Sequence, residues 1–228
     1  MIDIIVLTYN NLKNTRLCIE SIYEYTSDFR LIVLDNNSDD GTIEYLDGLN
    51  RDNLTLHFSP KNLGCVSGRN YAYSLSKDSE YICFLDNDQF VLEGWVESYM
   101  SYIDKGFAIV GFEGWKMRND FYPIRKVKVG ESYNYVGCGG MLIKREVIDD
   151  IGLFDSDFSP MYAEDPDFCW RAYDRGYKIC WNEDKRIYHQ PHKLLNPERR
   201  VYFNKSLNIL RNKWKDYKMP VFFNPIDK

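Results

Sequence analysis

Short runs of apolar residues recur along the first half of the chain, with helix-like patterns between them. These runs are rich in β-branched residues, which favour strands. They cover residues 4–8, 31–35, 54–58, 81–85 and 107–112. Strands that alternate with helices at this spacing predict βαβ units, and hence a mostly parallel sheet with helices on both faces.

The alternation stops after residue 112. Residues 113–136 contain many aromatic residues and glycines with weak periodicity, which predicts a long irregular excursion or lid. Further along, the patterns predict a strand at 140–144, a helix near 161–175, strands near 177–189 and a terminal amphipathic helix at 197–216. We therefore expect one α/β domain with an irregular second half and a C-terminal helix.

Composition narrows the class of protein without identifying it. Charged residues make up 28% of the chain, hydrophobic residues 44%, and the net charge is −5. This balance is typical of a globular protein and argues against a dedicated nucleic-acid binder, which would need a basic surface. The start of the chain does not resemble a signal peptide, and no apolar run approaches the roughly 20 residues of a membrane span.

The six cysteines indicate the redox state of the compartment. They are scattered, with no C-x-x-C pair, so we expect free thiols in a reducing compartment and no zinc site built from cysteines. The expected location is the cytoplasm, at most in peripheral contact with the inner face of a membrane.

Polar residues follow three of the predicted strands, at their carboxyl ends. They are Thr8, Tyr9 and Asn10, then Asp35, then Asp86, Asn87 and Asp88. Ligands of open parallel sheets bind at this edge. Asp86 and Asp88 fit a simple turn, because Asp and Asn bond to their own backbone, but they also fit a divalent-metal site. The three sets ending at one edge favour a ligand site.

The first of these turns contains no glycine, which excludes the dinucleotide fingerprint and the P-loop. A bound diphosphate would then need another partner, for which a metal ion is the natural choice. Residues 63–70 include Gly64 and Arg69, and a helix start built from small residues suits an approaching anion. Close packing of a helix on the sheet explains the same glycines equally well.

An acidic cluster stands at 164–167. Pro166 fits the first position of a helix, which predicts Asp165 as its N-cap. The same cluster, with Glu164 beside Asp165, fits a general base.

Two of the three histidines, His189 and His192, follow a predicted strand. Together with Asp88 they suggest a metal site, because imidazole and carboxylate are common ligands of divalent ions. His57 lies within a predicted strand and is interpreted as a packing residue.

Seven pieces of the sequence, in order, resemble the family 2 glycosyltransferases with a GT-A fold, from residue 1 to about residue 192. They are IIVLTYN, LDNNSDDGT, NLGCVSGRN, CFLDNDQF, GGMLIKREV, GLFD and YAEDPDFCWRAYDRGYK. The fifth and sixth resemble most the rhamnosyltransferase-type branch. The Q-x-x-R-W motif of processive synthases is absent, which favours transfer of a single sugar.

The resemblance implies a metal-dependent, inverting transfer of one sugar from a UDP- or dTDP-sugar to a glycan, lipid-linked or protein acceptor. It places Mn²⁺ or Mg²⁺ at Asp88, with Asp86 and His189, and His192 as the substitute for His189. It makes Asp165 the catalytic base with Glu164 beside it. The implied donor contacts are Thr8, Tyr9, Asn10, Asp35, Asn62, Gly64, Arg69, Asp86 and Asn87. The implied parts are a nucleotide-binding half (1–112), an acceptor and catalytic half (113–192) and a helical tail (193–228).

Three other interpretations compete. A haloacid-dehalogenase-type phosphatase would use Asp86 and Asp88 as nucleophile and acid, although three βα units precede the pair here and Gln89 follows it. A nucleotidyltransferase would need a glycine-rich first loop. A catalytically inactive sugar-binding module would have no need of both Asp88 and Asp165.

Overall fold

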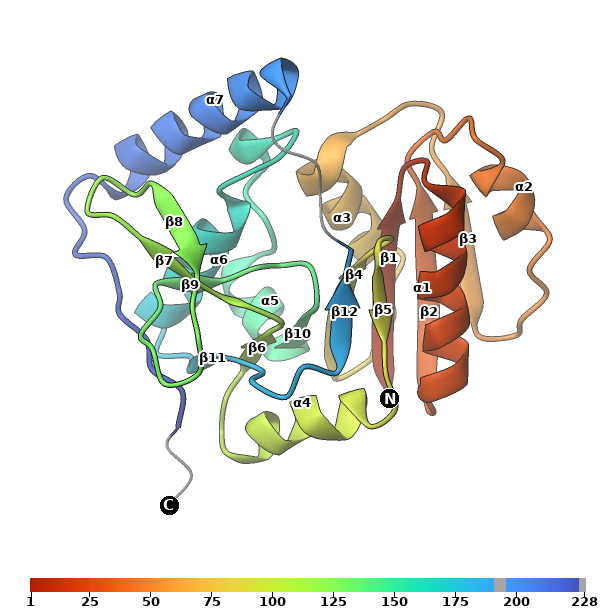
Figure 1. Ribbon diagram of the computed structural model, residues 1–228, viewed down its shortest axis with the longest axis horizontal. Coiled ribbons are helices and arrows are strands. Elements are labelled where there is room, and N and C mark those ends of the chain that lie inside the picture. The colour runs from red at the N-terminus through yellow and green to blue at the C-terminus, as the bar shows by residue number, and fades with distance from the viewer. Residues whose placement is uncertain (191–195, 226–228) are drawn as a thin grey trace.

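A mixed sheet forms the centre of the computed structural model, which describes residues 1–190 and 196–225 (Figure 1). Its seven strands are β1 (Ile2–Thr8), β2 (Phe29–Asp35), β3 (Leu54–Phe58), β4 (Tyr81–Asp86), β6 (Ile109–Gly111), β10 (Met141–Lys144) and β11 (Ile179–Trp181). They are ordered β11-β6-β10-β4-β1-β2-β3. β10 runs antiparallel to β4 and β6, while the other neighbours are parallel. The mostly parallel sheet predicted from the sequence is confirmed.

Helices cover both faces of this sheet. They are α1 (Leu12–Tyr25), α2 (Thr42–Asp47), α3 (Gly64–Ser74), α4 (Trp95–Asp104), α5 (Arg145–Ile151), α6 (Glu164–Asp174) and α7 (Pro197–Trp214), with a 3₁₀ turn at Ser156–Phe158. Along β1, Ile4 and Val6 pack in the core that α1, α2 and α4 share. Ile5 points to the opposite core, which includes residues of α3, α5 and α6. Burial on both faces is why the strands read as unbroken apolar runs.

Two smaller sheets flank the central one. β5 (Gln89–Val91) pairs antiparallel with β12 (Ile187–His189). The other sheet has the order β8-β7-β9, with β7 (Gly114–Met117), β8 (Pro123–Lys126) and β9 (Tyr135–Val136). Residues 113–136 are therefore more regular than the sequence predicts, and Phe121, Tyr133 and Tyr135 are buried in the core.

The predicted terminal helix is confirmed as α7, which lies along the side of the molecule that carries α6 and the β7–β9 sheet (Figure 1). Trp214, at its end, donates from Nε1 to Asp167 on α6 at 2.9 Å. Leu207 and Leu210 enter the same core as β9 and α6. In the described parts of the chain, no helix combines the length and apolarity that crossing a membrane requires.

Candidate active site

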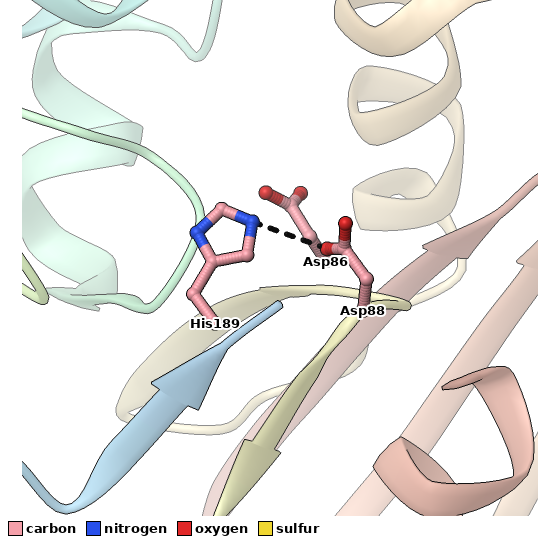
Figure 2. A group of neighbouring side chains, drawn as sticks. All are labelled: Asp86, Asp88 and His189. Carbon is pink, nitrogen blue, oxygen red and sulfur yellow. Dashed lines mark ion pairs between the residues drawn. The ribbon is translucent and has the colours of Figure 1, made fainter. Parts of the chain in front are cut away.

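The ends of β4 and β12 bring Asp86, Asp88 and His189 together (Figure 2). Asp86 ends β4, and Asp88 lies in the turn that leads into β5. Because β12 pairs with β5, His189 stands beside this turn, and its Nε2 is 3.3 Å from Asp88 Oδ1. One ligand atom from each residue lies within 4.8 Å of the others. Two carboxylates and an imidazole form a donor set that suits Mg²⁺ or Mn²⁺.

The charges of this group act on the imidazole. Burial lowers the pKa of His189, but the hydrogen bond to Asp88 and the charges of Asp86 and Asp88 outweigh it, so the pKa lies above its usual value. A site that attracts a proton in this way also attracts a cation, which fits the metal assignment.

Asp86, Asp88 and His189 are called the metal-ligand group below. Arg69 connects this group to the acidic start of α6. Its guanidinium, 6% exposed, lies 2.5 Å from Asp86 Oδ1 through Nη2 and 3.2 Å from Glu164 Oε1 through Nη1. The sequence suggested that Arg69 binds an anionic ligand. In the structure its anionic partners are two of the protein's own carboxylates.

The loop between β9 and β10 forms the other side of the site. The backbone N–H of Cys138 donates to Asp165 Oδ1 at 3.2 Å. A Cβ added to Gly139 would clash with Asp86 Oδ2, so any larger residue at this position would force the Asp86 carboxylate or the loop to move. This contribution of the loop was not predicted, although the glycine-rich run 137–140 is visible in the sequence.

Asp165 is not the N-cap, so that prediction was wrong. α6 begins at Glu164, and the N-cap is Ala163, with φ 65°. Tyr162 is also left-handed, with φ 77°, so the chain turns before the acidic cluster and Asp165 falls inside the first turn. Pro166 is accepted there because the first N–H groups of a helix have no partner within it. The Asp165 side chain is thereby left to bond with Cys138.

Burial dominates the acid–base properties of Glu164 and Asp165. It raises the pKa of Glu164 to about 8, with the charge of Asp165 adding and Arg69 opposing. Burial also raises the pKa of Asp165, against the hydrogen bond from Cys138 and the charge of Arg69. A carboxylate whose pKa is raised is a stronger proton acceptor than a free one.

All these groups line one cavity of about 750 Å³. Its polar part contains Asp86, Asp88, His189, Arg69, Glu164 and Asp165, together with Asn36 and Asn62. Its apolar part lies between the β7–β9 sheet, the start of α6 and α7. That part is lined by Trp115, Met117, Phe121, Tyr135, Tyr162, Phe203, Leu207 and Leu210.

Most of the predicted donor contacts meet in this cavity. Tyr9, Asn62, Gly64, Arg69, Asp86 and Asn87 are among its lining residues, whereas Thr8, Asn10 and Asp35 are not. Asp35 is fully buried, and both its oxygens accept hydrogen bonds from Ser38, one from the backbone and one from the hydroxyl. His57 packs on Tyr71, away from these groups. His192 lies outside the described residues.

Residues 3–152 match the family described as Glycosyl transferase family 2. The chain belongs to this family. The match overturns the phosphatase interpretation of Asp86 and Asp88. A curated relative, glycosyltransferase AglE of Haloferax volcanii, is 24% identical over 199 residues, which are 80% of this chain and 64% of the relative.

Superposition on solved structures shows that the chain has the GT-A fold. GalNAc-T7 with UDP, GalNAc and Mn²⁺ superposes with a TM-score of 0.79 at 13% identity, over 95% of this chain and 48% of that one. The mannosyltransferase PcManGT of Pyrobaculum calidifontis, with GDP-Man and Mn²⁺, gives a TM-score of 0.72 at 18% identity, over 96% and 65%. The chain thus spans less than two thirds of the length of each of these three relatives. None of the three is described as a rhamnosyltransferase, so that part of the resemblance has no support here.

Proposed function

We propose that the chain is a metal-dependent, inverting glycosyltransferase that moves one sugar from a nucleoside-diphosphate sugar to an acceptor hydroxyl. One observation carries the proposal: in a member of family 2, a metal-ligand group and the half-buried carboxylate of Asp165 face the same cavity. Asp86, Asp88 and His189 would hold Mn²⁺ or Mg²⁺. When bound, the metal would neutralise charge on the departing diphosphate.

Asp165 performs the proton step in this proposal. The acceptor oxygen bonds to the anomeric carbon, the bond from that carbon to the diphosphate breaks, and the acceptor proton passes to the Asp165 carboxylate. A single base opposite the leaving group produces inversion, as in inverting glycosidases. The Cys138 N–H fixes the direction of the carboxylate, and Arg69 forms ion pairs with both Asp86 and Glu164.

The acceptor belongs to the apolar part of the cavity. The flat faces of Trp115 and Tyr162 suit sugar rings, and the wall formed by α7 adds further apolar surface. A glycan, lipid-linked or protein acceptor fits this description. The chain would act as one domain. In it, residues 1–112 would form the donor half, residues 113–192 the acceptor half and residues 193–228 a closing tail.

The metal requirement can be tested on donor binding. Calorimetry with UDP and the purified chain should show binding in Mn²⁺ that EDTA abolishes. Asp88→Asn should weaken binding by about tenfold or more, while Asp216→Asn, the same change at a side chain 89% exposed, should not. Equal affinity in Mn²⁺ and EDTA would contradict the metal assignment. Tight donor binding with neither transfer nor donor hydrolysis would identify an inactive sugar-binding module.

The preference for a pyrimidine donor stays a prediction and rests on Asp35. Asp35 is fully buried and does not line the cavity, so it would accept the N3–H of uracil or thymine only after the residues that cover it move. Each of its oxygens has a second lone pair for this bond beside the one used with Ser38. Competition calorimetry should then place UDP and dTDP above GDP. Equal affinity for GDP would remove the preference, and GDP is the necessary comparison because PcManGT was solved with GDP-Man.

A further inference from the structure

A second group of ligand-type side chains lies on the far side of Arg69 from the metal-ligand group. It consists of Cys138, Glu164 and Asp165, with one ligand atom of each within 4.8 Å of the others. Cys138 Sγ is 3.8 Å from Glu164 Oε1. All three residues line the cavity, so a small cation can reach them from the substrate side.

Independent support comes from an oxygen that the protein leaves without a partner. Glu164 is 4% exposed, and its Oε2 makes no hydrogen bond to any described residue. A buried carboxylate oxygen in that state is costly. Arg69 supplies one positive charge to three carboxylates around it, those of Asp86, Glu164 and Asp165. Because burial raises the pKa of Glu164 and of Asp165, these two carboxyl groups tend to hold protons, which a bound cation would displace.

We infer that Cys138, Glu164 and Asp165 form a second, inhibitory site for a thiophilic divalent cation such as Zn²⁺. The two sites differ in ligand softness: a site with a thiolate selects Zn²⁺ over Mg²⁺, while carboxylate-rich sites suit Mg²⁺ and Mn²⁺. Sulfur and carboxylate oxygens are ordinary zinc ligands, and three protein ligands leave a fourth position open to the cavity. As the metal–sulfur bond forms, the thiol proton leaves to solvent.

The inhibitory consequence rests on the proposed function. A cation bound to Asp165 occupies the lone pairs that would accept the acceptor proton, so transfer stops even with donor and Mn²⁺ in place. The alternative is that Cys138 merely packs in the loop, with its thiol donating to Glu164. A metal ion with a thiolate absorption band distinguishes the two alternatives, because the band appears only if Cys138 binds the metal.

Co²⁺ binding tests the site itself and needs no enzymatic activity. The purified chain, saturated with Mg²⁺, is titrated with Co²⁺, and thiolate-to-cobalt absorption is followed in the near ultraviolet. Wild type should develop the band with one equivalent. Cys138→Ser, which keeps the backbone N–H to Asp165, should not, whereas Cys65→Ser, at the other cysteine lining the cavity, should match wild type. No band in wild type, or a band that survives in Cys138→Ser, would overturn the inference.

Zn²⁺ inhibition of transfer tests the consequence. At saturating Mn²⁺, Zn²⁺ should inhibit wild type and Cys65→Ser, and more Mn²⁺ should not relieve it. Loss of one ligand should raise the inhibition constant of Cys138→Ser by about tenfold or more, relative to its own uninhibited rate. A Cys138-dependent band without Zn²⁺ inhibition would support the metal site but contradict the claim that the bound cation blocks Asp165. A Cys138-dependent band in a chain without transferase activity would keep the site and reject the proposed function.

Discussion

At the scale of single residues, Arg69 pairs with acids of two groups for which we propose different roles. On one side Asp86 belongs to the metal-ligand group, and on the other Glu164 stands next to Asp165. A buried ion pair of this kind stabilises little in itself, but the loss of one partner leaves an uncompensated buried charge. The planar guanidinium of Arg69 contacts the carboxylates of Asp86 and Glu164 at once, which the single ammonium group of Lys could not reproduce.

Asp165→Asn should remove the proton acceptor and leave the fold intact. Loss of a general base commonly reduces the rate by about 10²–10⁴-fold. The amide oxygen can still accept from Cys138, and the lost charge in the first turn of α6 is worth only about 0.3–1 kcal/mol. Single-turnover transfer rates, donor calorimetry and thermal melts on the same preparation should show a slow enzyme that binds donor and melts nearly normally.

Glu164→Gln is the matched control for this prediction. It removes a neighbouring charge but not the proposed acceptor, so its rate should fall less than that of Asp165→Asn. The reverse ranking would move the base to Glu164. Transfer by Asp165→Asn at the wild-type rate, in a variant that melts normally, would end the assignment altogether.

The sequence could locate some of these residues and not others, because only some of them stand at recognisable strand ends. Asp86, Asp88 and His189 were predictable as neighbours, because the two acids lie at the end of β4 and His189 ends β12 beside them. The position of Asp165 was not, since the left-handed turn at Tyr162 and Ala163 moves the start of the helix and no composition rule encodes it. Gly139 matters through a close approach from a distant strand, which only the folded chain reveals.

At the scale of elements, the β7–β9 sheet explains why residues 113–136 appeared irregular. Its strands are four, four and two residues long, which is short for a period-two pattern to show. The pairing of β7 with β8 also shifts register between Lys116 and Met117, and a bulge breaks the alternation further. The long strands β1, β2 and β4, buried on both faces, carried clear signals by contrast.

Trp115, on β7, should contribute to acceptor binding and not to donor binding. Its ring stacks on Tyr135, with centroids 6.3 Å apart and planes at 14°, and it lines the apolar part of the cavity. Trp115→Ala should raise the acceptor KM by roughly 2- to 10-fold, the equivalent of one aromatic contact at about 0.5–1.5 kcal/mol. Donor hydrolysis, measured without acceptor, should stay near the wild-type rate.

Tyr122→Ala provides the comparison. Tyr122 lies just before β8, is 40% exposed and does not itself line the cavity, although its ring contacts Phe203, which does. Its loss should therefore raise the acceptor KM less than the loss of Trp115. If Trp115→Ala lowers transfer and donor hydrolysis equally, or fails to fold, then Trp115 packs the small sheet and the acceptor lies elsewhere.

At the scale of the whole molecule, α7 closes the cavity from one side. It carries five basic residues and one acidic residue in a chain whose net charge is −5, and its cations pair with acids of other elements. Lys213 Nζ contacts Asp155 at 2.5 Å and Asp167 at 2.8 Å, and Arg211 contacts Asp120 at 3.3 Å. Attraction between the basic helix and the acidic body therefore assists the apolar packing of Leu207 and Leu210.

Asp167 is the central link in this attachment. It is fully buried, accepts from Trp214 at 2.9 Å and from Arg171 at 2.8 Å, and pairs with Lys213. The sequence grouped Asp167 with the acids of a possible active site, but these contacts give it a structural role. Asp167→Ala leaves the buried Trp214 N–H and two partly exposed cations, Arg171 and Lys213, without their acceptor, a change worth about 3–5 kcal/mol.

The expected result of Asp167→Ala is a lower melting temperature, by about 6–20 °C for a chain of this size. Below that temperature, Mn²⁺-dependent nucleotide binding should persist, since Asp86, Asp88 and His189 lie on β4, the turn after it and β12. The acceptor KM should rise, because Phe203, Leu207 and Leu210 of α7 line the part of the cavity that we propose for the acceptor. Asp150→Ala, which breaks a surface pair with Arg175, should change stability by less than about 1 kcal/mol. Parallel loss of donor and acceptor binding in Asp167→Ala would show that α7 supports the whole site and does not act as a wall for the acceptor alone.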